Sequence, residues 1–276
     1  MKNTQTHTLT HTQEVFTDFA RKSGGLPKDW GWVDIFGLDR ALLNMIPEPC
    51  AGVILLFPCT ENIYQARRDE KERILGSPPS PASLKAYHVK QVAEFGNACG
   101  TIASVHALIN GATIYNKKNQ HSSALQEFRD GNANASPTDR GRALLKTSAL
   151  RSSSDQSASH RAAQTACPDR HGPDLDHHFV AFSPIVVGAG EDDNHIHVVQ
   201  LDGTKVRPVD HGTIASILEE AAHNDDDRNG EAVEEDADDP NKHSFLRAVA
   251  HVIRKNYMEV EPDSIEFTMM ALCKIK

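Results

Sequence analysis

Cys99 is the side chain that the sequence places best for nucleophilic chemistry. It opens the run CGTIASVHALIN, in which Ile102, Val105 and Ile109 fall on one face of a predicted buried helix. A cysteine in the first turn of a helix meets oriented amide groups and the positive end of the helix dipole, and both favour the thiolate over the thiol. Buried cysteines are more often inert packing residues, so position alone leaves both interpretations open.

A histidine and an acid follow Cys99 in the order that an activated thiol needs. His177 and His178 open one predicted strand, and Asp202 ends the next strand at Leu-Asp-Gly. Neighbouring strands would offer a base and an orienting carboxylate side by side. Together with the cysteine they would form a catalytic triad.

The residues alone leave alternatives at both positions. His177 and His178 are neighbours on a strand and face opposite sides of the sheet, so only one of them can join the site. Asp202 precedes a glycine, and Asp-Gly is also a common turn signature. Asp210 and Asp176 are weaker acidic candidates.

A metal site is the competing interpretation of the histidine-rich segment. His195 and His197 alternate onto one strand face, and Cys167 and His171 lie nearby in the sequence. Their spacings match no standard zinc signature, so a metal site is the weaker hypothesis.

The predicted elements that position these groups alternate loosely between strands and helices, which is typical of the α/β or α+β class. The run AGVILLF, 51–57, is short and continuously apolar, so we expect a strand in the middle of the sheet, covered on both faces. The strands 179–187 and 195–201 are predicted to form a hairpin. Helices are predicted over 14–23, 39–46, 62–75, 97–110, 136–145 and 244–258, and the last strand over 265–275.

Three segments are expected to lie outside the packed core. Residues 1–13 are interpreted as a polar N-terminal tail, and 152–176 is rich in Ser, Ala, His and Gln without apolar periodicity, which is typical of a mobile loop. Residues 219–239 hold eleven acidic side chains against the single base Arg228, which indicates a solvated acidic insertion. The remainder, 14–276, is expected to be one domain that carries both insertions.

Composition limits the classes of protein and partner. The 276 residues carry a formal net charge of -9, which argues against nucleic acid as the main partner. No run approaches the roughly 18 apolar residues that span a bilayer, and the first residues contain no apolar signal segment, so we expect a cytoplasmic or nuclear protein without a membrane span. The five cysteines include no CxxC pair and are expected to be free thiols: Cys50, Cys59, Cys99, Cys167 and Cys273.

Several segments resemble a single family, in the same order along the chain. NACGTIASVHALIN around Cys99 is similar to the active-site segment of the ubiquitin carboxyl-terminal hydrolases, the papain-like cysteine deubiquitinases of peptidase family C12. DHHFVAF around His178 resembles the histidine strand of this family, and HVVQLDGTKVRPVDHG around Asp202 resembles its aspartate strand. WGWVDIFGLDRALLNMIPEP and AGVILLFPCTE resemble its N-terminal region.

The resemblance implies a papain-like domain with a central antiparallel sheet, flanking helices and a knotted backbone. It implies hydrolysis of ester, thioester and amide bonds after the terminal glycine of ubiquitin, with Cys99 as nucleophile, His178 as base and Asp202 orienting the histidine. Ubiquitin is the expected partner, and no cofactor is needed. Segment 152–176 matches in position the family's crossover loop over the cleft, and the sequence ends after the last strand, so we expect a monomer.

One departure from the family concerns the group that binds the oxyanion. The family carries a glutamine six positions before the cysteine, whereas Ala93 occupies that position here and Gln91 lies two residues further upstream. We expect Gln91 to fill the role, with the two additional residues bulging before the helix. Without this donor the rate would fall roughly a hundred- to a thousandfold, which would leave a catalytically weak ubiquitin-binding protein.

Overall fold

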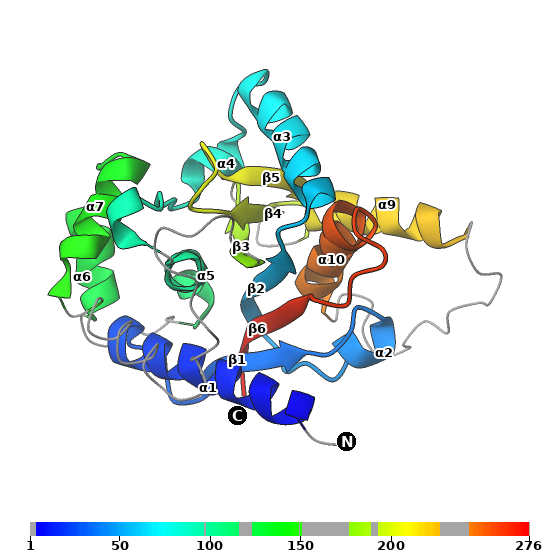
Figure 1. The fold of residues 1–276 in the computed structure, drawn as a ribbon, viewed down its shortest axis with the longest axis horizontal. Helices are drawn as coiled ribbons and strands as arrows, with labels where there is room; N and C mark the ends of the chain where they lie inside the picture. The colour runs from blue at the N-terminus through cyan, green and yellow to red at the C-terminus, as the bar shows by residue number, and fades with distance from the viewer. Residues whose placement is uncertain are drawn as a thin grey trace.

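Antiparallel strands form one six-stranded sheet at the centre of the part of the chain that the structure describes (Figure 1). The computed structural model describes residues 4–96, 98–115, 123–148, 150, 177–188, 193–226 and 243–275. Neighbouring strands follow the order β1-β6-β2-β3-β4-β5. The strand bounds are Trp30–Ile35 for β1, Cys50–Pro58 for β2, His177–Val186 for β3, Ile196–Leu201 for β4, Val209–Thr213 for β5 and Thr268–Lys274 for β6.

Strand β2 lies inside the sheet, with β6 on one side and β3 on the other. Its side chains feed two separate cores, because Ile54 packs on one face while Val53, Leu55 and Phe57 pack on the other. A strand that is apolar at both parities must be covered on both faces. The expectation of a buried strand in mid-sheet is therefore confirmed.

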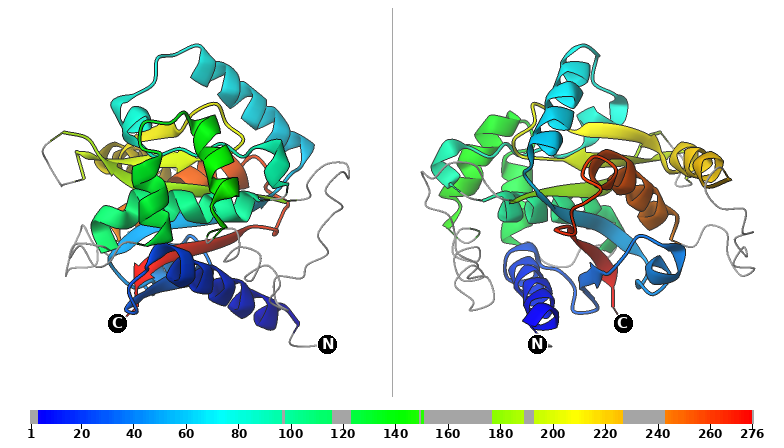
Figure 2. Two further views of the ribbon diagram at one scale, coloured as in Figure 1. Left: turned by 90° about the vertical axis from the view of Figure 1, so that its left-hand side faces the viewer. Right: turned by 45° about the vertical axis from the view of Figure 1, so that its right-hand side comes forward.

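Helix α5 covers one face of the sheet, with α1, α6 and α7 around it (Figures 1 and 2). The helix spans Cys99–Tyr115, is buried along most of its length and packs against β2 and β3. A Cβ atom at Gly111 would lie 2.4 Å from the carbonyl oxygen of Ala51, so a glycine is needed for the helix to lie this close to β2. The surrounding helices are α1 (Thr4–Gly24), α6 (Ala124–Gly131) and α7 (Pro137–Lys146).

Helices α2, α9 and α10 lie on the opposite side of the sheet, and α3 and α4 lie near β4 and β5 (Figure 1). Helix α10, Ser244–Ile253, packs Val249 and Val252 into the same core as Val53, Leu55 and Phe57 of β2. It continues as a π-helical turn, Arg254–Met258. The remaining bounds are Arg40–Leu43 for α2, Glu61–Leu75 for α3, Pro81–Lys85 for α4 and Ile214–Asp226 for α9.

Most predicted elements are confirmed in type. The helices expected over 62–75 and 97–110, the β3–β4 hairpin and the last strand all occur. Helix α7 begins as its sequence predicts, because the Ser136 hydroxyl accepts a hydrogen bond from the backbone of Asp139 at 3.1 Å and Pro137 occupies the first turn.

Two elements near the N terminus differ from the expectation. Helix α1 begins at Thr4, so most of the segment interpreted as a tail is helical and continuous with the helix expected over 14–23. Trp30–Ile35 forms β1, an element that the sequence did not predict. Five of its six residues are buried, so no alternation of polar and apolar residues marks it as a strand.

The expected insertions fall largely outside the described residues. Residues 219–226 of the acidic insertion belong to α9, whereas 227–239 and the whole of 152–176 lie outside. The knotted path implied by the resemblance depends on these stretches too and stays a prediction. Over the described ranges, no helix combines the length and the apolar character that crossing a membrane requires.

Candidate active site

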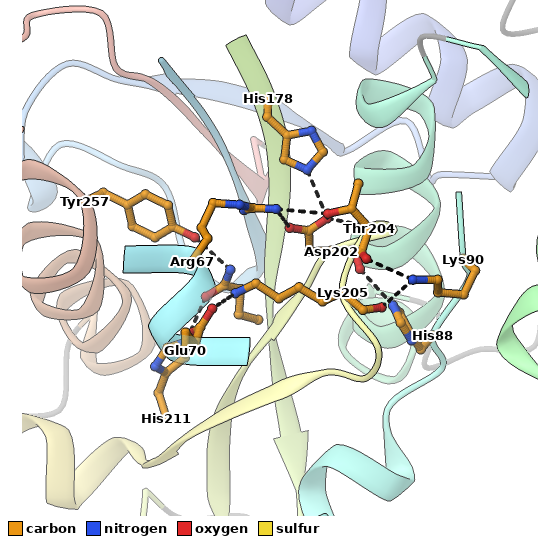
Figure 3. Close-up of polar contacts among 11 residues, drawn as sticks. Arg67, Glu70, His88, Lys90, His178, Asp202, Thr204, Lys205, His211 and Tyr257 are labelled. Atoms are coloured by element: carbon orange, nitrogen blue, oxygen red, sulfur yellow. Dashed lines mark hydrogen bonds and ion pairs between the residues drawn. The ribbon is translucent and has the colours of Figure 1, made fainter. Parts of the chain in front are cut away.

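The Asp202 carboxylate is the centre of a buried polar cluster at the end of β4 (Figure 3). Its Oδ1 atom accepts hydrogen bonds from Nε2 of His178 at 2.9 Å and from the backbone and hydroxyl of Thr204 at 2.8 Å each. Its Oδ2 atom accepts a hydrogen bond from Nη2 of Arg67 at 2.8 Å. The side chain has no exposed surface, so these donors replace water completely.

The surroundings of Asp202 keep this carboxylate ionised. Burial would raise its pKa, but the charge and hydrogen bond of His178 and the charges of Arg67 and Lys205 outweigh burial and hold the pKa well below its usual range. A permanent negative charge therefore faces one side of the His178 ring.

His178 lies on β3 opposite Phe57 of β2, and the two rings pack edge to face with their centroids 5.6 Å apart. Burial opposes a charged imidazole, but the charge and hydrogen bond of Asp202, together with the hydrogen bond and charge of Cys99, raise the pKa of His178 to about 9. Because Nε2 is engaged by Asp202, Nδ1 is the ring nitrogen left for the Cys99 thiol.

His177 takes no part in this cluster. Adjacent residues of a strand point to opposite faces, and the His177 ring lies 3.4 Å from the carboxylate of Glu266, with both side chains partly exposed. Of the two histidines that the sequence left open, the structure therefore brings His178 to Asp202.

Cys99 is the first residue of α5 and is buried, with 7% of its surface exposed. The helix start places its sulfur at the positive end of the helix dipole. Its interaction with the His178 ring completes a cluster of cysteine, histidine and aspartate drawn from α5, β3 and the turn after β4.

Gln91 lies against the same turn, ahead of α5. Its backbone N–H donates to the carbonyl oxygen of Gly203 at 2.9 Å, and its Nε2 donates to the carbonyl oxygen of Gly96 at 3.0 Å. The residues between form a 3-10 turn, Ala93–Phe95. That this stretch is two residues longer than in the family stays a prediction. A Cβ atom at Gly203 would lie 2.9 Å from Ile102 and 3.0 Å from Gln91, so the Asp202 turn fits this closely only with glycine there.

Arg67 is a member of this polar cluster that the sequence did not reveal. It comes from α3, and its Nη2 atom donates both to Asp202 and, at 2.9 Å, to the hydroxyl of Thr204. In the sequence it sits in a charged run beside Arg68 and Glu70, which looks like an ordinary solvated helix face. Only the fold brings it to a residue 135 positions away.

Further contacts hold the Asp202 turn in place (Figure 3). The Lys90 ammonium donates to the carbonyl oxygens of Thr204 and Lys205 at 2.9 Å each, and Lys205 forms an ion pair with Glu70. Nε2 of the His88 ring lies 2.9 Å from the Asp202 carbonyl oxygen. Burial lowers the pKa of His88 to about 4, so the ring is neutral and donates a hydrogen bond to that oxygen.

His106, a residue of α5, packs against the His88 ring. It is fully buried, and its Nε2 accepts a hydrogen bond from the backbone of Val89 at 2.9 Å. Of the histidines proposed for a metal site, His197 forms a pair with an acid instead, with 3.0 Å between its Nδ1 atom and Oδ1 of Asp210.

No group of three or more potential metal-binding side chains occurs within the described ranges. The two other residues of the hypothetical metal site, Cys167 and His171, lie outside those ranges.

The sequence and the fold are both similar to known proteins. The profile of ubiquitin carboxyl-terminal hydrolase family 1 matches residues 7–229. A probable ubiquitin carboxyl-terminal hydrolase of Dictyostelium discoideum is 31% identical over 261 residues, covering 95% of this chain and 85% of the relative. A ubiquitin carboxyl-terminal hydrolase of Drosophila melanogaster is 28% identical over 265 residues, covering 96% and 95%.

Among solved structures, the catalytic domain of Trichinella spiralis UCH37, crystallised with ubiquitin vinyl methyl ester, has a similar fold. The TM-score is 0.61 at 19% sequence identity, and the match covers 95% of this chain and 92% of that one. With a family profile that spans most of the sequence and a relative above 30% identity, the chain belongs to family 1 of the ubiquitin carboxyl-terminal hydrolases.

Proposed function

We propose that this protein is a deubiquitinating thiol hydrolase that cleaves ester, thioester and amide bonds at the C-terminal glycine of ubiquitin. The observation that carries this conclusion is the contact of His178 with both Asp202 and Cys99 in a chain of this family. Ubiquitin as the partner is supported by the names of the relatives and by the ubiquitin vinyl methyl ester bound to the similar Trichinella protein.

The geometry supports a two-step acyl transfer. His178 holds the Cys99 proton as an imidazolium, and the thiolate attacks the carbonyl carbon of the terminal glycine. His178 then gives its proton to the leaving group as the acyl thioester forms on Cys99. In the second step His178 takes a proton from water, the resulting hydroxide attacks the thioester, and ubiquitin leaves with a free carboxylate.

Asp202 and Arg67 hold His178 in the orientation that this cycle needs. A charge on the ring is stabilised by the adjacent carboxylate, which stays ionised throughout. Arg67 fixes the far oxygen of that carboxylate, so the near oxygen keeps facing Nε2 of His178.

Gln91 is the side-chain donor that we assign to the oxyanion. Its amide nitrogen carries two hydrogens, and the bond to the Gly96 carbonyl uses only one of them. The other hydrogen and the backbone N–H of Cys99 can then bind the oxygen that becomes negative in the tetrahedral intermediate. This arrangement argues against the alternative of a catalytically weak ubiquitin-binding protein.

A cytoplasmic location belongs to the same proposal. It is supported by the free thiols of Cys50, Cys59, Cys99 and Cys273 in the described part of the chain, since disulfides are uncommon in reducing compartments.

Turnover of a fluorogenic amide of ubiquitin tests the function. We expect hydrolysis by the native protein, no detectable hydrolysis by Cys99→Ala, and near-native hydrolysis by the matched control Cys50→Ser, which lies at the start of β2. Binding of ubiquitin should persist in Cys99→Ala. Native-like turnover in Cys99→Ala, or binding without turnover in the native protein, would contradict the proposed activity.

A further inference from the structure

Cys50 and Cys273 face each other across two neighbouring strands. Cys50 is the first residue of β2, and the register of the β2–β6 pair places Cys273 directly opposite. Near its other end β2 carries Phe57, the partner of His178 in the β2–β3 pair. The two thiols therefore lie at the end of β2 away from the catalytic cluster, and the mechanism uses neither of them.

The register of the β2–β6 pair gives Cys50 and Cys273 the shorter of the two Cα–Cα distances that alternate along antiparallel strands. The next pair outward, Pro49 with Lys274, is hydrogen-bonded, because the Lys274 N–H donates to the Pro49 carbonyl at 3.1 Å. Hydrogen-bonded and non-hydrogen-bonded pairs alternate, so Cys50 and Cys273 form a non-hydrogen-bonded pair. The Cα atoms of such pairs lie about 4.5 Å apart, within the range of about 4.4–6.8 Å that a disulfide bridges.

The Cys50 and Cys273 side chains are also in contact, and they differ in exposure. A hydrogen bond between the two thiols, burial, and the nearby charges of Cys50 and Glu48 raise the pKa of Cys273. Cys273 has no exposed surface, whereas Cys50 is only partly buried. Cys50 is therefore the thiol that a small reagent can reach, and Cys273 is a protonated partner in contact with it.

The backbone next to Cys50 can adjust to a covalent bond. The β2–β6 register shifts between Cys50 and Gly52, which is a bulge at the first residues of the strand. Bulges interrupt the hydrogen-bond ladder and bend one strand locally, so a small change of Cα position here disturbs the sheet less than it would in mid-strand.

We propose that Cys50 and Cys273 form a redox-active dithiol site that reacts with small two-electron oxidants, peroxides or low-molecular-weight disulfides, to give a β2–β6 disulfide. With a peroxide, Cys50 is oxidised to a sulfenic acid as the peroxide O–O bond breaks. The Cys273 sulfur then attacks the Cys50 sulfur, the S–S bond forms, and water leaves with the Cys273 proton. With a small disulfide, exchange through a mixed disulfide on Cys50 releases two small thiols.

The bond would tie the last strand of the chain to β2. It would close a loop of more than two hundred residues, and cross-links of long loops stabilise mainly by restricting the unfolded chain. We therefore expect oxidation to raise the resistance of the fold to denaturant.

The test uses the full-length chain with Cys59, Cys99 and Cys167 replaced by serine, so that only the two cysteines remain. After exposure of the folded protein to oxidised glutathione, and separately to hydrogen peroxide, free thiols are counted in denaturant and the intact mass is measured. We expect both thiols to disappear, a mass loss of two hydrogens, a linked peptide pair after digestion, and a higher urea midpoint that reductant reverses.

The matched control is the same chain with Cys50→Ser, in which the buried Cys273 should stay a free thiol under identical treatment. A lasting glutathione adduct or sulfinic acid on Cys50 with Cys273 still free would overturn the assignment. So would the survival of both thiols. Because these chains lack Cys99, neither outcome depends on the proposed activity.

Discussion

A single carboxylate, Asp202, connects His178, the proposed catalytic base, to the rest of the fold. Its two oxygens are divided between different tasks, since Oδ1 faces His178 and Thr204 while Oδ2 faces Arg67. A carboxylate held at both oxygens cannot rotate away from the histidine. The orientation of His178 therefore depends on an arginine that does not touch it through a hydrogen bond.

Replacement of Arg67 tests this dependence. Loss of a hydrogen bond to a charged group costs about 1.5–3 kcal/mol, so we expect Arg67→Ala to lower kcat about ten- to a hundredfold with a smaller change in KM. Arg67→Lys should recover part of the loss, because it keeps the charge but not the planar guanidinium whose Nη2 atom donates to both Asp202 and Thr204. The neighbour Arg68, which is exposed and pairs with Glu61, provides the control Arg68→Ala. A lower melting temperature with unchanged kcat would reduce Arg67 to a structural role.

The adjacent histidines provide an internally matched comparison. We expect His178→Ala to reduce kcat/KM by several orders of magnitude, because the base and the partner of the thiolate are lost together. His177→Ala should change it little, because this ring faces Glu266 at the surface. Initial rates on a fluorogenic ubiquitin amide measure kcat/KM of the two variants. A larger loss in His177→Ala than in His178→Ala would mean that the active site lies on the face of β3 that carries His177.

At the scale of elements, the start of α5 and the 3-10 turn before it set the positions of the two donors that we propose for the oxyanion. Gly96 ends the turn with φ 67° and ψ -142°, a backbone conformation that residues other than glycine rarely adopt. Its carbonyl oxygen accepts the hydrogen bond from the Gln91 side-chain amide.

Substitution at Gly96 should therefore act through Gln91. We expect Gln91→Ala to lower kcat roughly a hundred- to a thousandfold. Gly96→Ala should lower it in the same direction, with KM nearly unchanged, and Glu94→Ala on the exposed side of the turn should have little effect. If Gly96→Ala destabilises the fold while leaving kcat intact, the Gly96 carbonyl does not position the amide.

Local patterns predicted much of this arrangement but not the long-range pairing. The helix start at Cys99 and the β3–β4 hairpin follow from hydrophobic periodicity, which neighbouring residues determine. The insertion of β6 between β1 and β2 could not be predicted in this way, because it pairs the end of the chain with its beginning. Arg67 was missed for the same reason, since its charged helix is informative only once the Asp202 turn lies beside it.

For the whole molecule, the cluster around His178 and Asp202 links stability to pH. The pKa of His178 is raised from 6.5 to about 9 in the folded protein, so between these values the folded state binds a proton that the unfolded state has released. Stability therefore falls as pH rises through this window and is fully present below it. We expect the difference in unfolding free energy between the native protein and His178→Gln to shrink by about 3 kcal/mol between about pH 6 and about pH 10. Urea titrations measure it, and a constant or growing difference would contradict the raised pKa.

Covalent capture tests most directly whether Cys99 is the nucleophile of a ubiquitin-directed enzyme. The native protein would be incubated with ubiquitin that carries a vinyl methyl ester at its C terminus, and the adduct would be digested and sequenced by mass spectrometry. We expect one ubiquitin per chain, attached to Cys99, and loss of the adduct in both Cys99→Ala and His178→Ala. Attachment to Cys59 or Cys50, or no adduct with a folded protein, would contradict the assignment of Cys99 as nucleophile.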